Sequence, residues 1–442
     1  MLIRMTLQNF RSYKDENTLL LASTSKIRNF EEHVKEVGQL KLLKFIGIYG
    51  DNASGKTNIL KAANFIKMLV GYNQVTDLDF AFKENEAEPT LIEMVFCLDG
   101  LIYQYGIKVH KQTVPFVSLN ILDEYLNIIG NGEARSKEIY SAKNGINPNL
   151  IDKNDKAAFD LFLQGYKQLT KTAKNRLFLN YINDQDKIVK KSDLSGHFQK
   201  VFAYFKNDLV VLGAESTNMA YSQQNYLSTI IPYVKAFDHG IEDIKLFRIP
   251  NEDITKIVPQ QFFQDIINQL YKLNDETITL TIGNDNYFFF SKDPDSVVKC
   301  ETLQLKHHYI NSWFKFSEES EGTKKFIILM SFFSNKNAKK TFFLDELERS
   351  MHPASSEYIL RFFDHETHAQ ETQFIFTTHN PSFMKTNLRR DEIYFAEKDM
   401  YGTSAIFPLT DFETRSNSNL PALFLEGKFR KIPESGRNLF DL

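Results

Sequence analysis

The feature that most constrains this chain is a glycine-rich segment near its amino terminus, Gly50 to Thr57 (GDNASGKT). It matches the pattern G-x-x-x-x-G-K-[ST], in which glycines let backbone N–H groups curl around a phosphate. An apolar run, Phe45 to Tyr49, precedes it, and a helical pattern from Thr57 to Val70 follows it. A buried strand, a glycine-rich turn and a helix in this order predict a phosphate loop in an α/β fold.

Two residues of this loop have side chains suited to a nucleotide. Lys56 would reach the β- and γ-phosphates, and the Thr57 hydroxyl is a ligand of the kind that Mg²⁺ takes. The start of the following helix adds a favourable dipole for an anion. The alternative is a turn without a ligand, but the flanking strand and helix favour a nucleotide site.

A pair of carboxylates ends a second apolar run, Thr341 to Leu344, far along the chain. In a P-loop ATPase the first acid at such a strand end, here Asp345, holds Mg²⁺. The next acid, Glu346, can then polarise the attacking water as a general base. An ordinary acidic helix cap after a strand is the alternative, but a chain with a phosphate loop needs such an acid.

Two further segments have residues that could contact a phosphate. The apolar run Gln373 to Thr378 ends at His379, which could hydrogen-bond a γ-phosphate or the attacking water, although a lone histidine in this position is usually structural. Glu319 to Thr323 opens a predicted helix, Lys324 to Phe333, with small and hydroxyl residues that suit an anion. A simple helix cap by Ser320 or Thr323 would use the same residues.

In this order the four segments resemble those of ABC-type ATPases of the SMC and RecF kind. The loop GDNASGKTNI resembles the G-x-N-x-[SG]-G-K-[ST]-N-[IL] version found in that branch, and ESEGT resembles its signature motif. Within the branch, ESEGTKKF, FFLDELERSMHP, FIFTTHNPSF and LRRDEIYFAEKD resemble stand-alone bacterial ATPases of the AAA or OLD-like kind (RloA-like) from abortive-infection and restriction-linked operons. The resemblance covers residues 1–130 and 300–430, approximately.

The resemblance implies an ABC-type ATPase head of the α/β class, with a mixed sheet, an antiparallel β subdomain and a largely helical insertion. ATP and Mg²⁺ would be the cofactors, with Thr57 and Asp345 as metal ligands and Lys56, Glu346 and His379 as catalytic residues. The implied nucleotide contacts are Gly50, Asn52, Ser54, Gly55, Lys56, Thr57, Asn58, Ser320 and Gly322.

The resemblance also implies that ATP joins two copies of the chain. Ser320 and Gly322 of one copy would contact the γ-phosphate bound by the other, and Ser350 to Pro353 would cross the interface as the D-loop. One element departs from the family pattern, since Asn180 stands where the glutamine of the Q-loop is expected.

Three parts of the chain follow from these motifs. Residues 1–150 form the first half of the head, with the phosphate loop and a β-meander whose hairpin turns at Asp99-Gly100. Residues 151–290 form a mainly helical insertion, and residues 291–442 form the second half of the head. The runs expected as helices in the insertion are Ala157 to Lys171, Ser195 to Asn207 and Gln260 to Leu273. No heptad repeat persists there, so a compact lobe is expected rather than a coiled coil.

Composition excludes several classes of protein. The formal net charge is −3, so no global positive field attracts nucleic acid. The two cysteines, Cys97 and Cys300, form no cluster, which argues against a disulfide scaffold or a zinc site. No apolar run is long enough to span a membrane, and the amino terminus lacks the order of a secretory signal. A cytoplasmic protein without membrane contact is expected.

The motifs do not say what ATP turnover accomplishes. The first reading is a sensor or regulatory ATPase of an anti-phage, abortive-infection-like system, acting as a homodimer or higher oligomer on a separately encoded nuclease or toxin. The alternative is a RecF- or SMC-like DNA-binding ATPase of repair or chromosome maintenance. Only local basic clusters favour nucleic acid: Lys187/Lys190/Lys191, Lys324/Lys325, Arg389/Arg390 and Lys428/Arg430/Lys431. A self-contained nuclease is rejected, because too few residues follow His379 for a Toprim domain.

Overall fold

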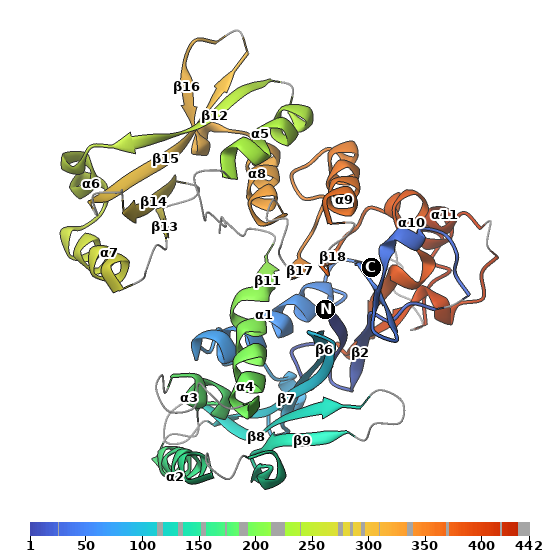
Figure 1. The fold of residues 1–442 in the computed structure, drawn as a ribbon. Coiled ribbons are helices and arrows are strands. Elements are labelled where there is room, and N and C mark those ends of the chain that lie inside the picture. Colours follow the sequence, from blue (N-terminus) through green and yellow to red (C-terminus); the bar gives the residue numbers. More distant parts are fainter. Residues whose placement is uncertain are drawn as a thin grey trace. The chain divides into compact units, whose positions relative to one another are not determined.

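The computed structural model divides the chain into two compact units, and no sheet is shared between them (Figure 1). Unit 1 comprises Met1–Gly213, Ala338–Leu347 and Gln370–Leu442, and unit 2 comprises Ala214–Asn337 and Glu348–Ala369. The residues that the structure describes are 1–24, 26–112, 118–130, 136–151, 156–172, 175–184, 193–213, 226–238, 240–272, 277–282, 286–292, 297–308, 310–333, 339–367, 371–415 and 418–431.

A six-stranded mixed sheet carries the motifs of unit 1. Its order is β11 (Leu209–Leu212), β17 (Thr341–Leu344), β18 (Gln373–Thr377), β5 (Phe45–Tyr49), β19 (Ile393–Lys398) and β20 (Ser404–Pro408). All neighbours pair in parallel except β19 and β20, which form an antiparallel hairpin. The strands β5, β17 and β18 are buried along their whole length, as expected for parallel strands covered on both faces.

Helix α1 (Lys56–Tyr72) follows the phosphate loop and buries an apolar stripe in the largest core of unit 1. Small side chains on this stripe, Ala62 and Ala63, are fully buried beside Ile59 and Ile66. Because α1 follows the carboxyl end of β5, and β17 and β18 run parallel to β5, the start of α1 lies at the edge of the sheet where these three strands end. This arrangement collects residues from distant motifs at one edge.

The second sheet of unit 1 is the predicted antiparallel β subdomain. Its order is β10 (Gly145–Ile146), β9 (Lys137–Ser141), β8 (Ser118–Ile129), β7 (Leu101–Gln112), β6 (Thr90–Leu98), β1 (Leu2–Gln8) and β2 (Asn17–Leu20). The β6–β7 hairpin turns at Asp99 and Gly100 with φ of 49° and 80°, the left-handed conformation that this dipeptide favours. A small hairpin, β3 (Val34–Val37) with β4 (Leu40–Leu43), lies outside both sheets. The α/β class with a mixed sheet and an antiparallel subdomain is confirmed.

The expected insertion, residues 151–290, is divided between the two units. Its first helices, α2 (Lys156–Thr172), α3 (Phe178–Asp184) and α4 (Asp193–Ala203), belong to unit 1, and a π-helix (Tyr204–Asp208) leads from α4 into β11. Phe178 and Phe198 join the same core as α1. The first part of the expected insertion therefore packs within unit 1. It does not form one lobe with the second part, which belongs to unit 2.

Unit 2 is built around a smaller antiparallel sheet. The strands run in the order β12 (Ile241–Ile249), β15 (Val298–His307), β14 (Asn286–Lys292) and β13 (Ile278–Ile282), with β16 (Trp313–Lys315) also on β15. The helices of this unit are α5 (Tyr226–Phe237), α6 (Asn251–Ile257), α7 (Gln260–Lys272), α8 (Glu321–Phe333) and α9 (Pro353–Thr367). The strand β12 was not predicted, because it is only partly buried and its charged residues interrupt the alternation.

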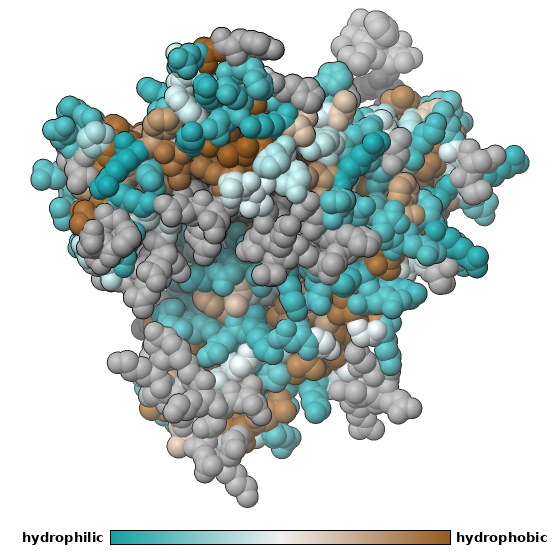
Figure 2. Space-filling view, turned by 45° about the horizontal axis from the view of Figure 1, so that its top comes forward, coloured by the Kyte–Doolittle hydropathy of each residue, from teal (hydrophilic) through white to brown (hydrophobic). Residues whose placement is uncertain are grey.

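No helix among the described residues is long and apolar enough to cross a bilayer. Among the coloured residues of the face in Figure 2, hydrophilic ones predominate, and hydrophobic ones gather in several places. Two short helices complete unit 1 near its carboxyl end, α10 (Phe383–Thr386) and α11 (Leu420–Leu425).

Candidate functional site

The phosphate loop leaves β5 and enters α1 through two glycines that no other residue could replace without strain. Gly50 has φ 151° and Gly55 has φ 112°. A Cβ atom at Gly50 would lie 2.2 Å from the carbonyl oxygen of Ala396, and one at Gly55 would lie 2.5 Å from Ser404 Oγ. The backbone therefore needs glycine for both conformation and space.

Lys56, the first residue of α1, lies across the loop that precedes it. Its Nζ donates hydrogen bonds to the carbonyl oxygens of Gly50 and Asp51, both at 2.9 Å, and the residue is only 5 % exposed. Next to it, Ser54 Oγ is buried and has no hydrogen-bond partner within the described part of the chain. A buried ammonium and an unpaired hydroxyl inside a glycine loop fit the phosphates of a nucleotide.

Three residues that the sequence analysis did not identify brace this loop. Ser404 Oγ donates its proton to the Ser54 carbonyl oxygen at 2.7 Å and lies 2.8 Å from Ser12 Oγ, whose own proton can complete that second hydrogen bond. Ser12 Oγ also accepts from Asn58 Nδ2 at 2.8 Å, and the buried Tyr13 hydroxyl donates to the Gly55 carbonyl at 3.2 Å. Asn58, predicted as a nucleotide contact, therefore anchors the loop to the β1–β2 connection.

The two predicted metal ligands come together. Thr57 Oγ1 donates to Asp345 Oδ1 at 3.2 Å, and Asp345 is 6 % exposed. A hydroxyl and a carboxylate are hard oxygen donors of the type that Mg²⁺ prefers. The donor set therefore fits a magnesium ion beside the phosphate loop.

Thr377, at the end of β18, connects the two carboxylate residues. Its hydroxyl donates to Asp345 Oδ1 at 2.6 Å and accepts from the backbone N–H of Glu346 at 2.7 Å. Glu346 itself has a left-handed backbone, with φ 47°, which directs the chain away from the strand. This threonine was inside the predicted strand run, but its role depends on the pairing of β17 with β18.

Glu346 and His379 follow neighbouring strands, β17 and β18, which are in parallel register with Leu344 opposite Phe376. Both residues therefore lie at the edge of the sheet that also carries the phosphate loop. Glu346 is partly exposed and His379 is exposed, so both side chains can be reached by a ligand. The sheet thus assembles Lys56, Thr57, Asp345, Glu346 and His379 at one edge.

The signature segment, Glu319–Thr323, belongs to unit 2. Ser320 Oγ accepts the Thr323 backbone N–H at 3.2 Å, so Ser320 caps α8, as the alternative interpretation expected. A Cβ atom at Gly322 would lie 2.9 Å from the Ser350 carbonyl oxygen, and Ser350 itself has φ 63°. The signature segment and the predicted D-loop of one chain therefore lie in contact in the same unit.

Asn180 is not placed to be a Q-loop residue. It is 3 % exposed, and its amide donates to the Val70 carbonyl near the carboxyl end of α1. Lys56 lies at the opposite end of this helix, about 20 Å away at about 1.5 Å rise per residue. Asn180 therefore joins α3 to α1, and we assign it no role at the metal.

Four residues of the basic clusters are buried or paired with acids among the described residues. Arg389 is 1 % exposed and pairs with Asp391, and Lys324 is 5 % exposed and lies 2.5 Å from Glu321. In the last cluster Lys431 contacts Asp411 at 2.6 Å and Arg430 lies 3.3 Å from Asp51. The cluster Lys187/Lys190/Lys191 lies outside the described residues.

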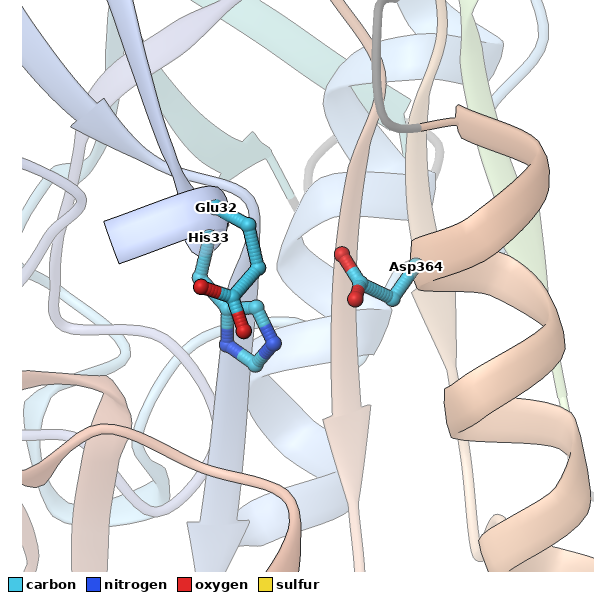
Figure 3. A group of neighbouring side chains, drawn as sticks. All are labelled: Glu32, His33 and Asp364. Carbon is cyan, nitrogen blue, oxygen red and sulfur yellow. The ribbon is translucent and has the colours of Figure 1, made fainter. Parts of the chain in front are cut away.

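A further group of titratable residues is drawn in Figure 3. Glu32 and His33 lie on the short helix η1 (Glu31–His33) of unit 1, and Asp364 lies on α9 of unit 2, so we assign no metal site to them. His33 Nδ1 instead lies 3.0 Å from the carboxylate of Glu392, and burial raises the pKa of that carboxyl. This buried pair holds η1 against the start of β19.

A phosphate loop between a buried parallel strand and a helix, with hydroxyl and carboxylate oxygens beside it, defines a P-loop nucleotide-binding protein of the α/β class. Residues 224–385 match the family described as "AAA domain, putative AbiEii toxin, Type IV TA system". The resemblance to AAA-type ATPases is thereby confirmed for this part of the chain, which includes Ser320, Asp345 and His379. The phosphate loop lies outside the matched residues.

Two solved structures are similar at low sequence identity. The SMC head domain from Thermotoga maritima is 15% identical, with a TM-score of 0.37, over 93% of this chain and 99% of that chain. The SMC head bound to the C-winged helix domain of ScpA is 14% identical, with a TM-score of 0.43, over 92% of this chain and 96% of that chain. No curated protein sequence matches the chain.

Proposed function

We propose that this chain binds and hydrolyses ATP with Mg²⁺. The observation that carries the proposal is the hydrogen bond between Thr57 and Asp345 beside the buried Lys56. It joins the residue after the P-loop lysine to the acid at the end of β17, the two ligand types that a nucleotide-bound magnesium takes from the protein. Bound Mg²⁺ would neutralise charge on the β- and γ-phosphates.

The residues at the sheet edge then have separate tasks. Lys56 binds the β- and γ-phosphates through charge-assisted hydrogen bonds. Glu346 accepts a proton from the attacking water, and Thr377 holds its backbone while also fixing Asp345. His379 is the second candidate for contact with the water or the γ-phosphate. Measuring ATP hydrolysis with and without Mg²⁺ tests this assignment.

The composite site is part of the same proposal. Ser320 and Gly322 would act on a nucleotide held by the phosphate loop of a second copy, so that ATP stabilises a homodimer or higher oligomer. Support comes from the contact of Gly322 with Ser350, which unites the signature and D-loop segments within unit 2. Mass measurement by light scattering, with and without ATP and Mg²⁺, tests the assembly.

The biological role that we propose is that of a sensor or regulatory ATPase in an anti-phage, abortive-infection-like system with a separately encoded effector, a nuclease or a toxin. The family description over residues 224–385, which names a putative AbiEii toxin and a type IV TA system, supports a link to such systems. The experiment is a phage challenge of cells that carry the chain with its neighbouring genes, comparing wild type with Lys56→Ala. Equal phage yield in both would contradict the proposal.

The alternative is a DNA-binding ATPase of the RecF or SMC kind. It needs an exposed cationic surface, and Arg389, Lys324 and Lys431 are instead buried or paired with acids. Stimulation of ATP hydrolysis by double-stranded DNA at physiological salt would favour this alternative.

A further inference from the structure

The side chain of Asp238 connects the signature segment to the sheet of unit 2. Asp238 follows α5, and its Oδ2 accepts a hydrogen bond from Thr323 Oγ1 at 2.8 Å. Its other oxygen, Oδ1, accepts from the backbone N–H of Gly240 at 3.0 Å, just before β12. The Gly240 N–H therefore fixes one oxygen of the carboxylate, and the other oxygen fixes the Thr323 hydroxyl.

Thr323 in turn holds Ser320 with two groups. Its backbone N–H donates to Ser320 Oγ at 3.2 Å, and its Oγ1 lies 2.8 Å from the same atom. The single proton of the Thr323 hydroxyl is given to Asp238, so the proton between the two hydroxyls must come from Ser320. Thr323 is 2 % exposed whereas Ser320 is exposed, so the chain of hydrogen bonds runs from the surface inward.

The other end of the signature segment is fixed from the same edge of the sheet. His307 Nε2 lies 2.8 Å from Glu319 Oε1, and His307 pairs with Ile241 in the register of β15 with β12. Residues at this end of the β12–β15 pair therefore contact both ends of the segment: His307 contacts Glu319, and Asp238 contacts Thr323. Ser320 lies between two anchored residues.

We propose that Asp238 is a positioning residue for Ser320. It fixes the rotamer of Thr323, so that Thr323 places Ser320 Oγ while the Ser320 proton remains able to turn toward an incoming phosphate oxygen. Rotation about one Cβ–Oγ bond is then the only change that Ser320 needs. Preorganisation of this kind is lost when the supporting hydrogen bonds are lost. The inference rests on the proposed function, in which Ser320 contacts the γ-phosphate.

The primary variant is Asp238→Asn, which keeps the shape of the side chain but can accept only one of the two hydrogen bonds without turning its NH₂ group toward a donor. We expect kcat for ATP hydrolysis to fall about three- to tenfold, the usual effect of one lost hydrogen bond. Affinity of a fluorescent ATP analogue for the phosphate loop should be unchanged. The matched control is Asp243→Asn, which changes a carboxylate on β12 that accepts from the Ile244 backbone N–H and pairs with Lys245.

Variants of Thr323 separate positioning from simple stabilisation. Thr323→Val removes the hydroxyl and should lower kcat as Asp238→Asn does, with no further loss in the double variant. Thr323→Ser keeps the hydroxyl and should restore most of kcat, even if its melting temperature is reduced. A change that followed the melting temperature and not the hydroxyl would overturn the inference.

Ser320→Ala distinguishes this inference from the proposed function. If Ser320→Ala lowers kcat and Asp238→Asn leaves it at the wild-type value, Asp238 has no positioning role and the composite site stands. If neither variant changes kcat while Lys56→Ala abolishes it, both the inference and the composite site are wrong. A lower kcat in both variants, with analogue binding intact, supports both.

Discussion

Thr57 and Asp345 are in direct hydrogen-bonding contact, with 3.2 Å between Thr57 Oγ1 and Asp345 Oδ1, although they are 288 positions apart in the sequence. The contact exists because β18 lies between β5 and β17, all three in parallel. The carboxyl ends of these three strands therefore lie at the same edge of the sheet. The first predictions concern the two sides of this contact.

Lys56→Ala should abolish ATP binding. Lys56 is the cation that the loop itself supplies to the β- and γ-phosphates, and its replacement also removes the donor to the Gly50 and Asp51 carbonyl oxygens. Equilibrium binding of a fluorescent ATP analogue measures the effect. Lys61→Ala, an exposed lysine on α1, is the control and should bind as wild type. Retained affinity in Lys56→Ala would reject the phosphate-loop assignment.

Glu346→Gln should keep ATP binding but slow turnover by about a hundredfold or more, the usual contribution of a general base. The amide can still hydrogen-bond to water but cannot accept its proton. Steady-state hydrolysis and analogue binding are measured together. His379→Gln made in parallel identifies the base, because a larger loss there with normal turnover in Glu346→Gln would transfer the role to His379.

Gly322→Ala should lower the stability of the protein, although alanine normally improves a helix by about 1 kcal/mol. The new Cβ would meet the Ser350 carbonyl oxygen at 2.9 Å, so the signature and D-loop segments would have to separate. Gly196→Ala in α4 is the matched control, since its Cβ meets nothing within 4 Å, and it should raise the melting temperature. Equal melting shifts in the two variants would contradict the close contact.

Glu124 should make stability fall as the pH rises. Burial raises the pKa of this carboxyl from 4.5 to about 7, even though the backbone N–H groups of Phe178 and Leu179 donate to it. Between these values the folded state binds more protons than the unfolded state, so the free energy of unfolding decreases from about pH 4.5 to about pH 7. The change should be on the order of 3 kcal/mol.

Denaturant unfolding across this pH range measures the effect of Glu124. In Glu124→Gln the decrease should be smaller, because the amide does not titrate, whereas the exposed Glu84→Gln should keep the wild-type slope. An unchanged slope in Glu124→Gln would show that other groups cause the pH dependence.

The sequence alone was sufficient to predict features that depend on neighbouring residues in the chain. The phosphate loop, Asp345 and the β6–β7 hairpin were predicted because each depends on a short run of residues with a defined backbone need. Ser12, Thr377 and Ser404 were missed, since serine and threonine are common and their contacts arise only from strand order. The Q-loop residue was not placed from the sequence, where Asn180 stands at the position expected for its glutamine; α3 directs Asn180 to the far end of α1.

The composite site predicts complementation between two inactive variants. Lys56→Ala lacks a functional phosphate loop but keeps the signature segment. In Ser320→Arg the loop is intact, and the bulky side chain blocks the exposed end of α8. If Ser320 acts in trans, a mixed dimer contains one intact loop facing one intact signature segment, so mixing the two should restore part of the hydrolysis.

The expected recovery from a mixture of equal amounts is about a quarter of wild-type activity, because random pairing makes half the dimers mixed and each has one working site of two. Light scattering with ATP and Mg²⁺ establishes that the variants assemble, which is the condition for a valid result. Lys56→Ala mixed with a Lys56→Ala, Ser320→Arg double variant is the negative control, since neither copy supplies a loop. Absence of recovery in variants that do assemble would place Ser320 in the same site as its own phosphate loop, and a fully active monomer would remove the ABC-type interpretation altogether.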